Sequence, residues 1–145
     1  MKWERGEFTV TDCRQDLDVE LIHHFLSQRS YWSKGIPQAV VRKALENSLC
    51  FGLFQSQDQI GFGRVVTDLA TFAYLADVFL LDSHQGQGLG KWLIECIVSH
   101  PELTGLRRWM LATGDAHRLY QKYGFVPLSK PEQFMERFNP NIYQL

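Results

Sequence analysis

The sequence predicts an α/β domain in which helices cover both faces of a mixed β-sheet. In the first half, neighbouring strand-like runs are joined by short polar turns, which requires antiparallel pairs. The second half alternates strand-like and helical patterns, which requires parallel strands joined by crossover helices. The 145 residues, of which 45% are hydrophobic, fit one domain of ordinary size. We therefore expect a single domain over residues 1–145, with six or seven strands and about four helices.

The N-terminal third has the pattern of one strand followed by two helices. Residues 8–12 alternate between apolar and polar side chains, as in a half-buried strand. Asp16 is placed to cap a helix over residues 17–28, whose apolar side chains share one face. An aromatic loop follows at residues 30–35, and a proline then marks the start of a second helix over residues 37–47.

Two strand-like runs in the middle of the chain predict a β-hairpin. Leu49–Gln55 and residues 59–67 are joined by the polar turn 56–58. Residues 75–81 form a third apolar run, which we also expect to be a strand. Residues 67–74 are compatible with a turn or with a continuation of either neighbouring strand.

The C-terminal half alternates helices and strands. The spacing of apolar residues predicts a helix over Leu89–Val98, and a strand is expected over residues 108–113. Residues 116–123 form a short helical pattern that ends at a glycine, which suits the left-handed position after a helix. We expect further strands over residues 125–128 and, at an edge of the sheet, over residues 134–138.

A glycine-rich loop over residues 85–90 is the strongest functional signal in the chain. Gly86, Gly88 and Gly90 follow an apolar strand and open the predicted helix Leu89–Val98. A glycine costs about 1 kcal/mol at a helical position, so three in five residues indicate a backbone that must approach a ligand closely. The unpaired N–H groups and the dipole at a helix start form an anion site that suits phosphate groups.

Two common phosphate-binding motifs do not fit this loop. No Gly-Lys-Ser/Thr sequence follows it, as a Walker P-loop requires. A Rossmann fingerprint would lie after the first strand of a βαβ unit, whereas these glycines come past the middle of the chain, after an antiparallel section.

Two motifs in the second half of the chain occur together in a known family. Gln85-x-x-Gly88-x-Gly90 stands between the fourth predicted strand and a long helix, and residues 116–125 read AHRLYQKYGF. The first is similar to the Q/R-x-x-G-x-G/A loop, and the second to the A-x-x-L-Y-x-x-x-G-F segment, of one superfamily. The chain thus resembles the GNAT acyl-CoA-dependent N-acyltransferases over residues 49–128, whereas residues 1–48 match in element order only.

The resemblance implies that acetyl-CoA is the co-substrate and indicates where it binds. Its pyrophosphate would accept hydrogen bonds from the loop that Gln85 opens, through the main-chain N–H groups of Gly86, Gln87, Gly88, Leu89, Gly90 and Lys91. The pantetheine arm would pair like an extra strand with Val78, Phe79 and Leu80. Many members have asparagine where this chain has Thr113, so a pantetheine contact there would use one hydroxyl in place of an amide.

The resemblance also implies a general acid at Tyr120, where many members have a tyrosine. Its hydroxyl can protonate the thiolate that leaves the thioester. Asp77 is the first candidate for the base that deprotonates the amine, because a carboxylate at the start of an apolar strand is costly unless it is used or paired. His84 and His117 are alternative bases. If they have no catalytic role, Tyr120 would be a core residue and Asp77 part of a structural ion pair.

Aromatic and polar residues are candidates for the acceptor pocket. Tyr31, Trp32 and Phe134 are candidate walls, and each is equally compatible with ordinary packing. Asp68 or Tyr74 is available to hold a cationic amine. We therefore expect the acceptor to be a primary amine of a small or amino-acid-like molecule, which attacks acetyl-CoA directly in a ternary complex.

Composition and charge limit the classes of partner that we expect for this protein. The net charge is −1, which predicts no general attraction to nucleic acid or anionic membranes. Cys13, Cys50 and Cys96 are far apart and lack CxxC spacing, so we expect reduced thiols, no metal site and a cytoplasmic protein. The N-terminus is charged and no apolar run approaches the length of a membrane span. A homodimer paired through the late strands is compatible with the pattern.

Other classes of function remain open from the sequence. A non-catalytic acyl-CoA-binding regulator on the same fold would bind acetyl-CoA without turnover. An unrelated α/β phosphate- or nucleotide-binding enzyme would be stabilised by ATP or NAD and not by acetyl-CoA. A thiol-nucleophile enzyme fits less well, because no cysteine lies in a recognisable Cys/His context.

Overall fold

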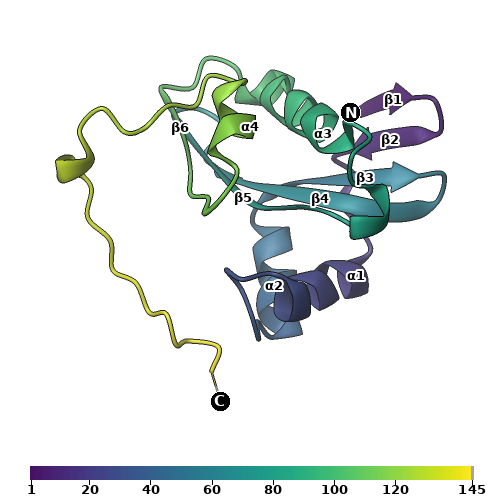
Figure 1. Cartoon of the computed structure of the whole chain (residues 1–145), viewed down its shortest axis with the longest axis horizontal. Coiled ribbons are helices and arrows are strands. Elements are labelled where there is room, and N and C mark those ends of the chain that lie inside the picture. The colour runs from purple at the N-terminus through teal and green to yellow at the C-terminus, as the bar shows by residue number, and fades with distance from the viewer. Residues whose placement is uncertain (145) are drawn as a thin grey trace.

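The computed structural model describes residues 1–144, and its strands form one mixed sheet in the order β1-β2-β3-β4-β5-β6 (Figure 1). The strands are β1 (Lys2–Arg5), β2 (Phe8–Thr11), β3 (Leu49–Gln55), β4 (Asp58–Thr67), β5 (Phe72–Leu80) and β6 (Arg108–Leu111). Neighbours from β1 to β5 are antiparallel, and β5 and β6 are parallel. The mixed sheet predicted from the sequence is confirmed. Leu145, the last residue of the predicted domain, lies outside the described residues.

Helices cover both faces of this sheet. They are α1 (Val19–His24), α2 (Gln38–Glu46), α3 (Leu89–Val98) and α4 (His117–Gln121). Figure 1 shows α1 and α2 on one face and α3 and α4 on the other. The core is divided accordingly, with Ile22 and Phe62 buried on the first face and Leu93 and Ile97 on the second. Within residues 1–144, no helix has the length and apolar character that crossing a membrane requires.

The N-terminal elements differ from the sequence-based expectation. β1 was not predicted because three of its four residues are charged, yet Trp3 packs on Phe51 and the guanidinium of Arg5 lies 4.9 Å from the centre of the Trp92 ring. The first helix begins at Val19, and its cap is Asp18, whose side chain accepts the N–H of Leu21. A π-helical turn over Phe25–Arg29 then leads to the aromatic loop.

The two late strands predicted over residues 125–128 and 134–138 are wrong for the single chain. Neither stretch forms a strand of the sheet. Figure 1 shows the chain after α4 (yellow-green to yellow) running away from the sheet. Pro127 and Pro131 fall in this connection, where each fixes φ and removes an N–H donor. The structure thus lacks the two predicted late strands and has β1, which was not predicted. The sheet has six strands in total.

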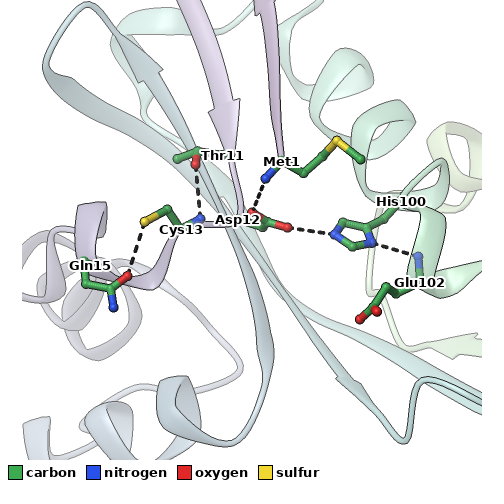
Figure 2. Close-up of polar contacts among 7 residues, drawn as sticks. All are labelled: Met1, Thr11, Asp12, Cys13, Gln15, His100 and Glu102. Atoms are coloured by element: carbon green, nitrogen blue, oxygen red, sulfur yellow. Dashed lines mark hydrogen bonds and ion pairs between the residues drawn. The ribbon is translucent and has the colours of Figure 1, made fainter.

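A polar cluster fastens the N-terminal strands to the loop after α3 (Figure 2). Asp12 accepts hydrogen bonds from the amino group of Met1 at 3.0 Å and from Nε2 of His100 at 2.7 Å. Nδ1 of His100 accepts the N–H of Glu102 at 3.1 Å, so the ring proton lies on Nε2. Because His100 is only 5% exposed, this arrangement satisfies a buried imidazole on both sides.

Candidate active site

β6 pairs along its whole length with the N-terminal half of β5, which leaves the rest of β5 open on that side. The parallel ladder runs from Phe72 opposite Arg108 to Leu75 opposite Leu111. Within residues 1–144, no strand pairs with residues 76–80 on the β6 side. Such an edge can accept an extended ligand as an additional strand. It carries the three residues expected to pair with pantetheine, Val78, Phe79 and Leu80.

A β-bulge in β5 lies immediately beyond the last residue that pairs with β6. Phe79 pairs with Phe62 of β4 and Ala76 pairs with Arg64, so β5 has one residue more than β4 between these pairs. Asp77 in this bulge has a φ of +55°, a left-handed conformation that few non-glycine residues adopt. Bulges are common next to active sites, where they redirect a side chain and leave main-chain groups unpaired.

The carboxylate of Asp77 has a partner on each oxygen. Oδ2 accepts a hydrogen bond from Nε of Arg64 at 2.8 Å, and Oδ1 accepts one from Nε1 of Trp32 at 2.8 Å. Arg64 also donates to the hydroxyl of Ser48 at 3.1 Å. The side chains of Arg64 and Asp77 are 19% and 10% exposed, so each charge compensates the burial of the other.

The aromatic loop between α1 and α2 contacts both β5 and the connection after β6. Trp32 reaches the bulge of β5, as described, while the hydroxyl of Tyr31 accepts the N–H of Gly114 at 2.9 Å. Gly114 lies in the connection from β6 to α4. The two rings meet edge to face, with centres 5.0 Å apart. The structure thus brings Tyr31, Trp32 and Asp77 together.

The glycine loop presents main-chain N–H groups at the start of α3. Gly86 and Gly88 have φ of +81° and +77°, which favours glycine, and Gly88 is the N-cap of α3. A Cβ built at any of the three loop glycines would meet no atom within 4 Å, so the space around the loop is open. Within residues 1–144, the N–H groups of residues 86–91 donate no hydrogen bond, and the first that does is Trp92, to Gly88.

Side chains around this loop add positive charge. The ammonium groups of Lys91 and Lys122 are close, and the hydrogen bond and like charge of Lys91 lower the pKa of Lys122. Among the described residues, neither lysine has a carboxylate within 4.0 Å. Gln85 donates to the main-chain oxygen of Leu80 at 3.0 Å, so its amide links the loop to the end of β5. The loop therefore suits an anionic ligand.

Tyr120 of α4 is buried in the core cluster that includes the buried residues of α3. It is 8% exposed, and burial, with smaller contributions from Tyr31 and Asp115, raises its pKa to about 12. Tyr120 lines a cavity of about 300 Å³ together with Thr113 and His117. The hydroxyl remains protonated at neutral pH and can donate that proton to a ligand.

Residues 46–127 of the chain match the family model described as an acetyltransferase (GNAT) domain. The chain belongs to the GNAT acetyltransferase family. It is 34% identical to a protein of Gibberella zeae that is assigned as an acetyltransferase, FG08082, over 83% of this chain and 79% of the relative. The GNAT acyltransferase activity predicted from the sequence is therefore supported at the level of the family.

Solved structures agree with this membership. A protein of Xanthomonas campestris pv. campestris assigned to the GNAT family, xcc2953, is 47% identical, and its crystal structure matches with a TM-score of 0.94 over 98% of this chain and all of that one. A GNAT acetyltransferase from Elizabethkingia anophelis, whose structure contains acetyl-CoA, shares the fold with a TM-score of 0.64 at 15% identity, over 91% and 88% of the two chains.

Other residues of this GNAT chain that the sequence singled out have local structural partners. The hydroxyl of Thr113 accepts the N–H of Ala116 at 3.1 Å, which holds the start of α4. His84 lies between the hydroxyl of Ser83 and the side-chain oxygen of Gln55, which occupies both ring nitrogens. His117 is exposed at the cavity beside Tyr120 and remains an alternative base. Within residues 1–144, no cluster of three His, Cys, Asp or Glu side chains is placed to hold a metal ion.

Asp68 lies apart from Tyr31, Trp32 and Asp77. Its carboxylate accepts N–H groups of Ala70, Thr71 and Phe72 and the Thr71 hydroxyl, which closes the turn between β4 and β5. These hydrogen bonds, led by the one from the Thr71 hydroxyl, hold its pKa well below the ordinary range. The turn lies at the end of β5 opposite the glycine loop, so the geometry does not support Asp68 as an acceptor ligand.

Tyr74 lies between the turn and the bulge. It pairs with Val66 of β4 and Met110 of β6 and is half-buried. Its role as a ligand of the acceptor amine stays a prediction. Phe134 contacts the guanidinium of Arg108 on the outer side of β6, with 4.9 Å from the guanidinium carbon to the ring centre.

Sequence reasoning missed Arg64, the partner of Asp77. A signal for it was present, because Arg64 is the one charged residue in the apolar run from Ile60 to Val66, where a charge needs a partner. The bulge that brings Arg64 and Asp77 together gives no comparable signal, since no glycine or proline marks residues 76–78.

Proposed function

We propose that this GNAT protein is an N-acetyltransferase that moves the acetyl group of acetyl-CoA to a primary amine of a small or amino-acid-like acceptor. The observation that carries the proposal is the row of unused N–H groups at residues 86–91, next to the open edge of β5. The loop suits a diphosphate, and the edge suits an extended amide-bearing arm that leads from it.

The bound acetyl-CoA would lie with its pyrophosphate on the glycine loop and its thioester beside the bulge. A fold neighbour contains acetyl-CoA, which agrees with this use of the fold. The bulge leaves Asp77 and Val78 without partners in the β4 ladder, so a main-chain N–H there is available to the thioester oxygen. Lys91 and Lys122 would add positive charge near the phosphates.

The transfer would proceed by direct attack. The neutral amine nitrogen bonds to the thioester carbonyl carbon, the C–S bond breaks, and the thiol sulfur leaves with the electron pair. Tyr120 would give its hydroxyl proton to that sulfur, since its raised pKa keeps the hydroxyl protonated. Asp77 would take the proton of the amine, directly or through water, with its orientation held by Arg64 and Trp32.

The acceptor pocket would lie on the α1–α2 side of Asp77. A hollow of about 100 Å³ there is lined mainly by apolar residues of α2 and of the segment between α1 and α2, and also by Arg64, Asp77 and Tyr143. Its size and mixed lining suit a small amine that carries an apolar group. Tyr31, Trp32 and Tyr74 would complete the approach to it. We also propose a cytoplasmic location, where the free Cys13, Cys50 and Cys96 stay reduced.

Release of free thiol from acetyl-CoA across a library of small amines and amino acids tests the proposal. We expect thiol release with at least one amine, at a rate that saturates with acetyl-CoA. Tight acetyl-CoA binding without turnover on any amine would support the regulator on the same fold. Thermal stabilisation by ATP or NAD and not by acetyl-CoA would contradict both.

A further inference from the structure

Arg64 and Asp77 place a positive and a negative charge side by side at the hollow of about 100 Å³ beside α2. Among the described residues, they are the only charged side chains that line this hollow. Its other walls are mostly aliphatic, and they include the buried side chains of Leu26, Ile36, Val41 and Leu45. The hollow thus combines an apolar interior with one pair of opposite charges.

An amine that carries no anionic group does not match this pair. To give its proton to Asp77, the amine has to reach the carboxylate that Nε of Arg64 contacts at 2.8 Å. In its ammonium form it would then add a second positive charge beside the guanidinium. The side chains of Arg64 and Asp77 are mostly buried, and an uncompensated charge is costly in such a place. The geometry therefore favours an acceptor that brings a negative charge of its own.

The guanidinium of Arg64 can bind such a group. It donates to Asp77 through Nε and to Ser48 through Nη1, and neither of these hydrogen bonds uses Nη2. A planar guanidinium can donate to several partners at once and matches the geometry of a carboxylate. Because Arg64 and Asp77 are in direct contact, a carboxylate on the carbon next to the amine can reach Arg64 while the amine reaches Asp77.

The hollow limits the size of the third substituent on that carbon. Its volume of about 100 Å³ is about three times the 30 Å³ or so that one water occupies in the liquid. This suits an aliphatic side chain of about three or four carbons. Leu26 and Val41 are each 2% exposed, so core packing holds the walls in place. An aromatic ring would require these walls to move.

We propose that the acceptor is a free α-amino acid with a short aliphatic side chain, such as valine or leucine. Its amine faces Asp77, its carboxylate accepts a hydrogen bond from Arg64, and its side chain fills the hollow. The zwitterion brings a negative charge to Arg64 and a positive charge to Asp77, so the occupied site gains no net charge. The inference rests on the proposed transferase function and deepens it, because it names the acceptor class and gives Arg64 a role in specificity.

Thiol release from acetyl-CoA with matched acceptors tests the role of the carboxylate. Leucine and leucinol have the same side chain and amines of similar basicity, but only leucine has a carboxylate. We expect kcat/KM for leucine to be higher by about ten-fold or more, the effect of a hydrogen bond between charged groups. Equal or faster release with leucinol would overturn the proposal. Equal or faster release with a leucyl dipeptide would also overturn it and would indicate the N-terminus of a peptide as the acceptor.

Arg64→Lys tests the same contact from the side of the protein. It keeps a positive charge beside Asp77 and removes the planar set of N–H donors. We expect the preference for leucine over leucinol to fall about ten-fold, while kcat/KM for leucinol changes far less. A purely structural role of Arg64 would lower both values alike. That outcome, or an unchanged preference, would overturn the proposal.

Two variants of α2 test the size of the hollow. Ala44 lines the hollow, whereas Ala39 is exposed on the same helix and does not line it. Ala44→Leu should shift the preferred acceptor from leucine to alanine or glycine, and the matched control Ala39→Leu should keep the wild-type preference. Circular dichroism checks that both variants are folded. An unchanged preference in folded Ala44→Leu would overturn the placement of the side chain.

Binding without turnover separates this inference from the transferase function. Leucine and leucinol are titrated calorimetrically into the protein saturated with coenzyme A. Tighter binding of leucine that Arg64→Lys weakens would support the acceptor site even without thiol release, and it would then contradict only the transferase. Thiol release with other amines, together with no binding of leucine or valine, would overturn the acceptor class and leave the transferase standing.

Discussion

Nε1 of Trp32 donates a hydrogen bond of 2.8 Å to Oδ1 of Asp77, and this contact ties the loop between α1 and α2 to the bulge of β5. Two segments that are 45 residues apart in sequence thereby share one carboxylate. The indole N–H has no role in acetyl transfer itself, so its effect is on position. Trp32 would thus hold the proposed acceptor side of the site in register with the strand that would bind the cofactor.

Trp32→Phe should therefore weaken acceptor binding and leave acetyl-CoA binding nearly unchanged. The change keeps a smaller aromatic ring and removes the N–H that donates to the Asp77 carboxylate. Loss of that hydrogen bond should raise the acceptor KM about ten-fold. Steady-state kinetics with each substrate varied in turn measures both constants. Tyr31→Phe is the matched comparison, since it removes the other tether of the loop, the one to Gly114. An equal rise in both KM values would contradict a role confined to the acceptor side.

Replacement of Asp77 should affect both stability and turnover, and the two effects can be separated. Asp77→Asn leaves Arg64 mostly buried without a counter-charge, which destabilises the fold by about 3–5 kcal/mol. The double variant Arg64→Met with Asp77→Asn removes both charges and should recover most of that loss. If Asp77 accepts the amine proton, kcat stays about 10²-fold low in the double variant. Recovery of kcat together with stability, measured by urea unfolding and thiol release, would show that Asp77 is only structural.

The fold was predictable from the sequence where apolar periodicity and turn residues act locally. Leu49–Gln55 and Leu89–Val98 lie where the pattern places them. β1 was not predictable, because its side chains are charged and its pairing depends on contacts with Phe51 and Trp92 that the local sequence does not show. Residues 134–138 show the opposite case, a strand pattern that forms no strand among residues 1–144.

The conformation of the glycine loop was predictable from the sequence, and the surroundings of Asp77 were less so. Gly86 and Gly88 adopt the positive φ for which glycine is needed, so local chemistry determines the loop. The ion pair of Asp77 with Arg64 depends on strand register and on a bulge, which are set by pairing across the sheet. Asp68 was a candidate ligand of the acceptor amine, but its carboxylate closes its own turn. A carboxylate in either role looks the same in the sequence.

Tyr120→Phe should lower kcat by about 10²-fold, the usual effect of losing a general acid, and leave acetyl-CoA affinity unchanged. Because burial raises the pKa of Tyr120 to about 12, its hydroxyl stays protonated across the working range. Ionisation of Tyr120 should therefore cause no loss of kcat up to about pH 10, two units below that value. Tyr123→Phe, which removes a hydroxyl three residues away that bonds to α3, should change kcat far less. Equal kcat values for the two variants would refute the assignment.

Gly88→Asp should impair acetyl-CoA binding, because it places a carboxylate beside the N–H groups that we propose bind the pyrophosphate. Gly105 offers a matched control, since it has a φ of +75° against +77° for Gly88 and both have open space around a built Cβ. Either substitution costs about 1–2 kcal/mol for the left-handed conformation. Only Gly88→Asp should also raise the dissociation constant of acetyl-CoA, because its carboxylate would repel the phosphates. Like-charge repulsion at this distance corresponds to about ten-fold or more. Calorimetric titration measures this, and equal affinities in the two variants would exclude the loop as the phosphate site.

Asp12→Ala should destabilise the fold at neutral pH and lose this effect in acid. Burial alone would raise the pKa of Asp12, but the hydrogen bonds from His100 and the amino group of Met1 outweigh it, and the pKa lies below 3.8. The stabilisation is therefore complete above the unfolded-state pKa, about 3.9, and decreases as pH falls through the folded-state value.

At pH 7 the loss should be about 1–3 kcal/mol, because Nε2–H of the buried His100 is left without its acceptor. Urea unfolding at about pH 7, 4 and 3 compares the wild type with Asp12→Ala and with the exposed control Asp16→Ala. The difference for Asp12→Ala should shrink at the lowest pH, while Asp16→Ala stays close to the wild type throughout. A difference that stays constant with pH would mean that the carboxylate acts through packing, because only an ionised Asp12 gains from the amino group of Met1.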